Sequence, residues 1–278
     1  MMKFIPVLIL TLIFQTFHSQ SYRAIYKFEY KRDSSKVNLT SLNMILDIQA
    51  KNTKFYFHKL LVADSILKRT NKPIRLSIPI QQIVSRKSNS FENENFVNIQ
   101  DKYFSFSSID KMEWKILDSL KQFQDYKIQK AETFWGGRRW NAWFCSEIPI
   151  PEGPYKFRGL PGLIILLSDT ENNFFYSLIS LKKMNEEYDT SDVVETSLRL
   201  KPIQIDLKKY QKLLINHYNN PFSEYENMKG TDWQLTIYDK KINTLEGLKE
   251  IKKQYQADIK RNYNPIDLEN AVEYTDEK

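Results

Sequence analysis

Residues 135–164 read WGGRRWNAWFCSEIPIPEGPYKFRGLPGLI and hold most of the turn-forming residues of the chain. Five of the seven glycines fall here, with four of the ten prolines and three of the five tryptophans. Glycine reaches positive φ and lets backbones approach closely, whereas proline fixes φ near a turn value. Such density in a glycine-poor chain predicts strands joined by tightly specified turns.

Two turns are expected within this segment. The adjacent residues Gly136 and Gly137 predict a hairpin between strands at 126–134 and 138–148. Pro161 and Gly162 fit the central positions of a type II turn, in which Gly162 would take positive φ. Sequential strands with short connections favour an antiparallel meander.

The rest of the chain shows strand patterns first and helical patterns late. Residues 22–30 alternate aromatic and polar side chains, which indicates a half-buried strand. Helical spacing marks residues 205–219 and 245–262. The sequence therefore predicts a mostly β (α+β) fold: a large curved antiparallel sheet or a half-open barrel, with helices concentrated in the C-terminal third. Further strands are expected at 42–48, 53–58, 96–99, 103–106, 113–118, 163–167 and 174–182, and a short helix at 60–69.

The central segment also resembles a known family. Residues 159–164 are similar to the hexapeptide that names the GLPGLI family of exported bacterial proteins. The likeness continues through residues 137–144, 147–150 and 153–157, with weaker echoes at 110–114, at 129–131 and at 264–268, which reads NPIDL. Ile128 stands where the family often has Cys. That family has no known function. The resemblance implies export and a place near TonB-dependent outer-membrane receptors.

Residues 1–20 have the pattern of a secretory signal peptide. Lys3 precedes an apolar run at residues 4–17, which is short for a bilayer span, so we expect cleavage; an uncleaved N-terminal anchor is the alternative. The mature chain is then expected in the periplasm or secreted, and not as an integral membrane protein. We expect one antiparallel β-rich domain with late helices at 21–266, and an acidic flexible tail at 267–278.

The charge balance narrows the class of partner. The chain has 41 Lys and Arg against 34 Asp and Glu, a net charge of +7. A basic exported protein favours an anionic ligand or an acidic partner, whereas export argues against nucleic acid. The two signs are interspersed, which is also typical of an ordinary solvated surface.

Catalytic and metal signatures are weak. Cys145 is the single cysteine, so it forms no disulfide within the chain and is either a buried core residue or a nucleophile that needs a nearby base. His58 and His217 share no ligand spacing, and we expect no metal and no cofactor, although one His with carboxylates stays open as a site.

The central segment is predicted to be a folding element first and a binding surface second. Its four cations, Arg138, Arg139, Lys156 and Arg158, are expected at an exposed rim. Replacing all four by Gln would then change the free energy of unfolding by less than about 1 kcal/mol. The alternative is that the tryptophans pack the sheet. The candidate binding residues are Arg138, Arg139, Trp140, Trp143, Tyr155, Lys156 and Arg158, and the structural motif is Gly159, Leu160, Pro161, Gly162, Leu163 and Ile164.

Three functions fit these observations. The first is a non-catalytic exported protein of the cell envelope, an accessory or binding protein near outer-membrane transport, with a TonB-dependent receptor or another envelope protein as partner. The second is a carrier of an apolar or amphipathic ligand on the concave face of the sheet. The third is an uncharacterised hydrolase that uses Cys145, which would require an accessible thiol beside a histidine.

Overall fold

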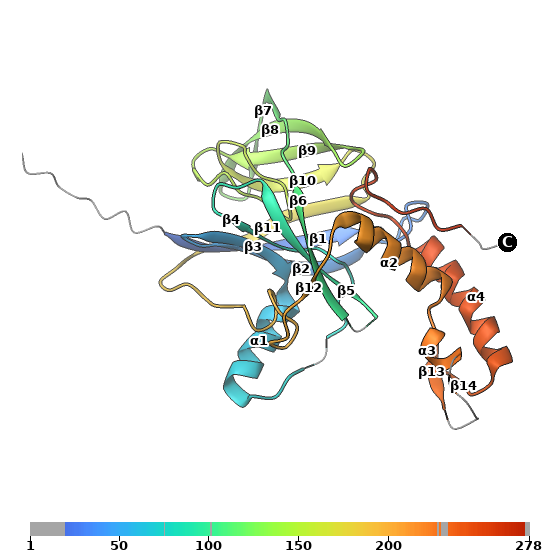
Figure 1. Ribbon diagram of the computed structural model, residues 1–278. Coiled ribbons are helices and arrows are strands. Elements are labelled where there is room, and N and C mark those ends of the chain that lie inside the picture. Colours follow the sequence, from blue (N-terminus) through green and yellow to red (C-terminus); the bar gives the residue numbers. More distant parts are fainter. Residues whose placement is uncertain (1–19, 75, 101, 227, 229–232, 276–278) are drawn as a thin grey trace, which may run out of the picture.

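The computed structural model describes residues 20–275, apart from residues 75, 101, 227 and 229–232 (Figure 1). The predicted signal peptide lies outside the described residues except for Gln20. Within the described part, twelve strands form one large sheet. Their bounds are β1 (Ser21–Tyr30), β2 (Thr40–Ile48), β3 (Asn52–Phe57), β4 (Ile83–Lys87), β5 (Glu92–Ile99), β6 (Lys102–Ile109), β7 (Lys115–Phe123), β8 (Tyr126–Trp135), β9 (Arg138–Cys145), β10 (Leu163–Asp169), β11 (Phe174–Met184) and β12 (Ile203–Gln204).

The strand order is β12-β6-β5-β4-β3-β2-β1-β11-β10-β9-β8-β7. Neighbouring strands are antiparallel except β12 and β6, which are parallel. The sheet is open, because β12 and β7 lie at its two ends instead of pairing with each other. The predicted mostly β fold with a large antiparallel sheet is confirmed.

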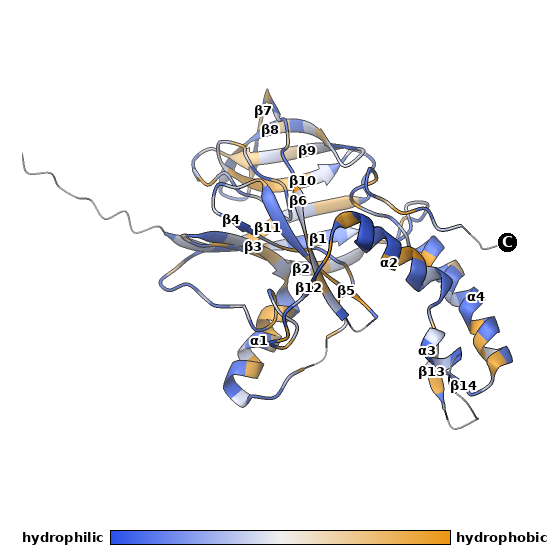
Figure 2. Cartoon of the chain, viewed as in Figure 1, coloured by the Kyte–Doolittle hydropathy of each residue, from blue (hydrophilic) through white to orange (hydrophobic). Residues whose placement is uncertain are grey.

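The helices lie mainly late in the chain, as predicted. The first half of α2 meets the sheet, where Leu207 and Tyr210 pack against the cluster that holds Phe104 and Phe106. Hydrophobic and hydrophilic residues alternate along this helix (Figure 2). The following elements extend away from the sheet (Figure 1) around a small core of their own that includes Trp233. The helices are α1 (His58–Thr70), α2 (Leu207–Asn219), α3 (Ser223–Glu226) and α4 (Leu245–Arg261), and a separate hairpin joins β13 (Leu235–Ile237) to β14 (Lys240–Ile242).

Local capping explains where the two long late helices begin. The Asp206 carboxylate accepts a hydrogen bond of 2.6 Å from the backbone N–H of Lys209 at the start of α2. The Thr244 hydroxyl accepts one of 3.1 Å from the N–H of Gly247 at the start of α4. Each cap satisfies a donor that the helix itself cannot pair. The α2 cap fixes the end of the helix that lies against the sheet.

The main core lies along the central strands. β10 is buried through most of its length, as its apolar sequence requires. Buried Tyr26 on β1 donates a 2.6 Å hydrogen bond to the carbonyl of Ile164, which ties β10 across the core. Trp140 on β9 packs against Phe157, with ring centroids 4.5 Å apart. The central segment therefore builds the core as predicted.

The two predicted turns have different outcomes. The Gly136–Gly137 hairpin is confirmed: both residues have positive φ, 59° and 71°, and Trp135 pairs with Arg138. The positive φ expected for Gly162 is wrong, because the positive-φ glycines are Gly136, Gly137 and Gly159. Glycine is required at 162 for another reason. A Cβ there would lie 2.1 Å from the carbonyl oxygen of Cys145, so the two chain segments approach too closely for any side chain.

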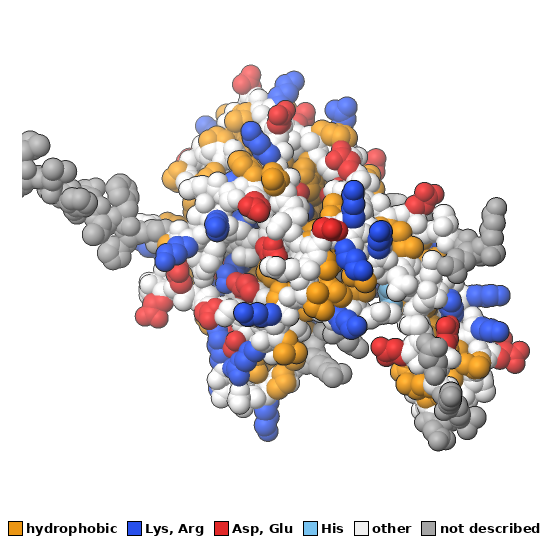
Figure 3. Space-filling model, viewed as in Figure 1, with side chains coloured by type: hydrophobic (Ala, Val, Ile, Leu, Met, Phe, Trp, Pro, Cys, Tyr) orange, Lys and Arg blue, Asp and Glu red, His pale blue; other side chains and the backbone are white. Residues whose placement is uncertain are grey.

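Charges of both signs are interspersed over the face shown in Figure 3. This distribution is typical of a solvated surface, as the sequence also indicates. No helix in the described part of the chain is long and apolar enough to cross a bilayer.

Candidate functional site

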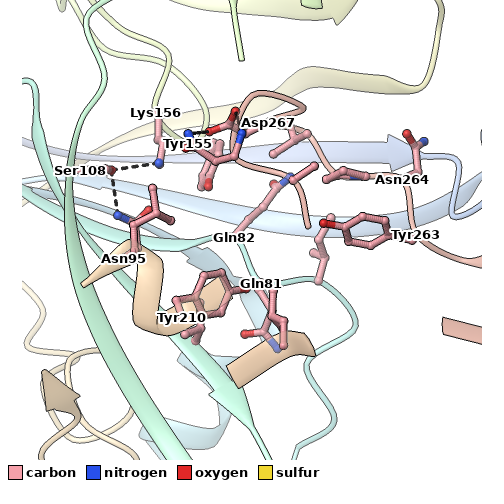
Figure 4. Close-up of a pocket in the computed structure, with 18 of the residues that line it drawn as sticks. Gln81, Gln82, Asn95, Ser108, Tyr155, Lys156, Tyr210, Tyr263, Asn264 and Asp267 are labelled. Carbon is pink, nitrogen blue, oxygen red and sulfur yellow. Dashed lines mark hydrogen bonds between the residues drawn. The ribbon is translucent and has the colours of Figure 1, made fainter. Parts of the chain in front are cut away.

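A cavity of about 760 Å³ is bounded by β5, β6, helix α2 and the C-terminal segment 262–271 (Figure 4). The end of β1 and the segment before β4 complete its walls. Its lining mixes tyrosine and aliphatic side chains with amides, hydroxyls and charged groups. The lining residues labelled in Figure 4 are Gln81, Gln82, Asn95, Ser108, Tyr155, Lys156, Tyr210, Tyr263, Asn264 and Asp267.

A compact polar network centres on Ser108 in the cavity wall. The Ser108 hydroxyl donates to the Asp110 carboxylate at 2.6 Å and accepts from Asn95 Nδ2 at 2.9 Å and from Lys156 Nζ at 3.0 Å. The Lys156 ammonium also lies 3.1 Å from Asp110. A hydroxyl has one proton and two lone pairs. All three are used here, so the Ser108 oxygen has no free lone pair with which to attack a substrate in this arrangement.

A second ionic network lies behind the first. Asp110 accepts a 3.0 Å hydrogen bond from Asn93 Nδ2, and Arg86 Nη1 reaches Asn93 Oδ1 at 3.4 Å. Arg86 pairs with Glu152, which also pairs with Arg158 at 3.1 Å. These charged side chains are all buried. Buried charges without partners are costly, so this network holds the 151–158 loop in one position against β4 and β5.

A strap formed by residues 264–268 closes one side of the cavity. Arg138 Nη2 donates to Asn264 Oδ1 at 2.8 Å and to the Pro265 carbonyl at 2.9 Å, while its Nη1 lies 3.3 Å from Asp169. The N–H of Leu268 donates to the Gly136 carbonyl at 2.8 Å. Two motifs far apart in the sequence, WGGRRW at 135–140 and NPIDL at 264–268, thus form one junction.

The last residues of this strap, Asp267 and Leu268, are also the first residues of the predicted tail. The sequence predicts a flexible tail from residue 267, whereas its described part makes ordered contacts. The Val272 N–H donates to the Tyr263 hydroxyl at 2.8 Å, and the Tyr274 ring lies 4.9 Å from that of Tyr218. The domain boundaries drawn from the sequence stay predictions.

The apolar wall of the cavity is aromatic. The rings of Phe106 and Tyr210 stack with centroids 4.9 Å apart.

Burial, and then the nearby Asp110, raise the pKa of Tyr155 well above its ordinary value, so its hydroxyl stays neutral. Gln82 accepts a 2.8 Å hydrogen bond from Tyr176, but its Nε2 is buried and has no partner among the described residues.

The predicted rim cations are mostly not at a rim. Arg138, Lys156 and Arg158 are only 6%, 4% and 4% exposed, and each is held in an ion pair. Arg139 is exposed as expected. The expectation of four exposed cations is therefore wrong for three of them. The sequence pattern does not reveal that Asp169, Asp110 and Glu152 pair with these three cations in the fold.

The predicted aromatic residues separate into two groups. Trp140 is 1% exposed and packs in the core, and Trp143 is half-buried with Lys121 Nζ 4.0 Å from its ring centroid. Tyr155 and Lys156 line the cavity, whereas the other predicted binding residues do not. Binding by any of them stays a prediction. Within the hexapeptide motif, Leu160, Gly162, Leu163 and Ile164 are buried, and Gly159 and Pro161 are exposed.

Cys145 lacks the solvent access that the hydrolase hypothesis requires. Its side chain is fully buried in the main core. His217 lies on α2, 3.1 Å from the hydroxyl of Tyr255, which packs on the small core around Trp233. The described residues contain no group of three His, Cys, Asp or Glu side chains arranged to hold a metal.

Several cavity residues were not predicted from the sequence. Asn95, Ser108 and Asp110 lie just outside the predicted strands 96–99 and 103–106, and Gln82 lies in a connection that follows Pro79. One signal was available: Asn93 and Asn95 are polar at two successive same-face positions of a strand. Polar side chains at two such positions, when buried, need partners.

A family model described as "Protein of unknown function (Porph_ging)" matches residues 100–166. The match runs from the β5–β6 turn into β10 and includes Ser108, Asp110, Lys156 and the hexapeptide. The match is thus to a family whose function is unknown. No curated protein matches the chain.

Two solved structures share a distant likeness. "Structure of PNGF-II in C2 space group" has 14% identity and a TM-score of 0.49, and "Structure of PNGF-II in P21 space group" has 16% identity and a TM-score of 0.47. Each match covers 70% of this chain and 33% of the other chain. The chain thus spans about a third of the length of these structures.

Proposed function

We propose that this protein is a non-catalytic binding protein that holds a small amphipathic ligand in the cavity beside α2. The observation that carries the proposal is the cavity itself, of about 760 Å³ and with a mixed lining. Ligand sites commonly have volumes of roughly 300–1,000 Å³, with apolar walls and a few placed polar groups. The stacked Phe106 and Tyr210 rings provide such a wall, and the Ser108 network lies beside it.

Binding is favoured over catalysis by the state of the reactive groups. The Ser108 hydroxyl is saturated with hydrogen bonds, and the Cys145 thiol is fully buried. A nucleophile needs an accessible lone pair and a base that can take its proton. The cavity supplies hydrogen-bonding and stacking groups, which suit recognition.

The compartment and the partner are part of the proposal. The signal-like residues 1–20 and the resemblance to the GLPGLI family support an exported protein of the cell envelope, periplasmic or secreted. The same resemblance supports work near outer-membrane transport, with a TonB-dependent receptor as one partner. The mass of the protein isolated from the envelope fraction tests the first part: cleavage near residue 20 is expected, and retention of residues 1–20 would contradict it.

A displacement titration tests ligand binding in the cavity. The probe is 8-anilinonaphthalene-1-sulfonate, whose fluorescence rises in apolar sites, and dodecanoate is the competitor. Ala271 lines the cavity, so Ala271→Trp places an indole within it. We expect saturable binding by the wild type and at least tenfold weaker binding by a folded Ala271→Trp variant. Equal binding by both proteins would place the probe elsewhere and contradict the proposal.

A further inference from the structure

We infer that the cavity is selective for amphipathic molecules with a single anionic group, held at the cavity edge by Lys31 and Arg32. This inference rests on the proposed binding function and specifies the chemistry of its ligand. It assigns the charged end to the residues that follow β1 and the apolar body to the wall of α2 and β6.

The charges of the lining carry the first step. Lys156 is neutralised by Asp110 at 3.1 Å. Both Asp267 carboxylate oxygens accept hydrogen bonds from Asn270, at 3.2 and 2.8 Å. Lys31 and Arg32 also line the cavity, and neither side chain has an ion-pair or hydrogen-bond partner among the described residues. The Asn270 hydrogen bonds leave the charge of Asp267 in place, so the described lining residues include one carboxylate and two cations outside ion pairs, and both cations lie beside the end of β1.

The backbone at Lys31 is fixed in place. The Lys31 N–H donates to the Asn173 carbonyl at 2.9 Å, and its carbonyl accepts from Asn264 Nδ2 at 2.8 Å. Asn264 is itself held by Arg138 at 2.8 Å. A preorganised site loses less entropy when a ligand binds than a mobile loop does. The strap and the hairpin junction thus hold the main chain from which the Lys31 side chain extends.

The apolar part of the ligand has a separate place. Phe106 and Tyr210 stack on each other, and Leu207 and Leu214 of α2 extend the same wall. Asp267 limits the charge of the ligand, because no cation pairs with it among the described residues, whereas Lys156 compensates Asp110. A second anionic group near the strap would approach Asp267, which like-charge repulsion disfavours. A single anionic head with an apolar body matches this distribution.

Other surfaces do not support an equal inference. The edge strand β7 exposes Ile116 and Leu120, but nothing about this strand specifies what would cover them. The cavity combines volume, apolar wall and unpaired charge in one place.

The test compares two ligands that differ in charge but share the same chain. Affinities of the folded chain are measured for dodecanoate and for 1-dodecanol, each below its aggregation limit, by competition at low and at physiological salt. The double variant Lys31→Gln/Arg32→Gln is compared with Lys182→Gln/Lys183→Gln. The second pair removes the same net charge from exposed positions at the opposite end of the β1–β11 pair.

We expect dodecanoate to bind the wild type more tightly than dodecanol does, with a preference that falls as salt rises. Lys31→Gln/Arg32→Gln should weaken dodecanoate about five- to tenfold and leave dodecanol unchanged, since partly exposed charge contacts are individually modest. The control pair should change neither. Equal affinities for the two ligands, or equal losses in both variants, would overturn the anion site while leaving the binding function intact. Failure of both ligands to bind would overturn the binding function itself.

Discussion

Replacing Gly162 by Ala should strongly destabilise the protein. The new Cβ would lie 2.1 Å from the Cys145 carbonyl oxygen, 2.7 Å from its carbon and 3.0 Å from Ser146 Cα. All three contacts are with backbone, so no side-chain rotation relieves them. The 145–146 segment or the start of β10 would have to move by about 1 Å, because carbon and oxygen normally approach no closer than about 3.3 Å.

The cost follows from what such a shift disturbs. Overpacking a well-packed site costs about 1–3 kcal/mol, and sometimes more. The shift also disturbs the 3.0 Å hydrogen bond from the Leu163 N–H to the Ile148 carbonyl, worth about 1 kcal/mol net. We therefore expect Gly162→Ala to lower the free energy of unfolding by about 3–4 kcal/mol, measured by urea denaturation followed by tryptophan fluorescence.

Two comparisons separate close approach from backbone strain. Asn tolerates positive φ better than Ala does. If close approach is the cause, Gly162→Asn is no better than Gly162→Ala; if strain were the cause, Asn would recover part of the stability. Gly159 has a φ of +99°, but a Cβ at this position would lie 3.6 Å from its nearest neighbour, the Phe91 ring. Gly159→Ala should therefore lower the free energy of unfolding by only about 1–2 kcal/mol. A Gly162→Ala variant within 1 kcal/mol of wild type would refute the reasoning.

Three further predictions concern burial. Arg138→Gln should lower the free energy of unfolding by about 3 kcal/mol, because it leaves Asp169 buried without its cation, whereas Arg139→Gln at an exposed position should change it little. Equal urea midpoints for the two variants would show that the Arg138–Asp169 ion pair does not stabilise the fold. Burial raises the pKa of Tyr210 to about 12, so the neutral hydroxyl contributes fully to the free energy of unfolding below pH 10, and this contribution is lost as the pH rises toward 12. Tyr210→Phe should therefore reduce the change in unfolding free energy across this pH range by about 1–2 kcal/mol. The same pH dependence in wild type and variant would count against this prediction. Cys145 should react with a thiol reagent only after denaturation, and rapid labelling of the native protein would contradict its burial.

The sequence predicted most of the fold because its signals are local. The alternating residues 22–30 became β1, and the adjacent Gly136 and Gly137 became the hairpin turn. The strand β4 was not predicted, because its five residues, Ile83–Lys87, follow a proline-rich stretch and contain Ser85 and Arg86. The buried Arg86 is accommodated in this strand by Glu152 and the Tyr155 carbonyl, which reach it from a distant loop, and by Asn93 on β5.

The candidate site was predicted far less well, because it depends on contacts between distant residues. Lys156 lies 46 residues from Asp110 in the sequence, and Arg138 lies 126 residues from Asn264. No short-range pattern reports such pairs. The cations of the central segment therefore resembled surface residues, although three of the four are buried.

The position of a heavy-atom ligand tests the central claim most directly. Crystals grown with 12-bromododecanoate locate the bromine by its anomalous signal. The account predicts a bromine peak inside the cavity near Phe106 and Tyr210, with the carboxylate beside Lys31 and Arg32. A bromine peak found only on another surface, or an unoccupied cavity at saturating ligand, would contradict it.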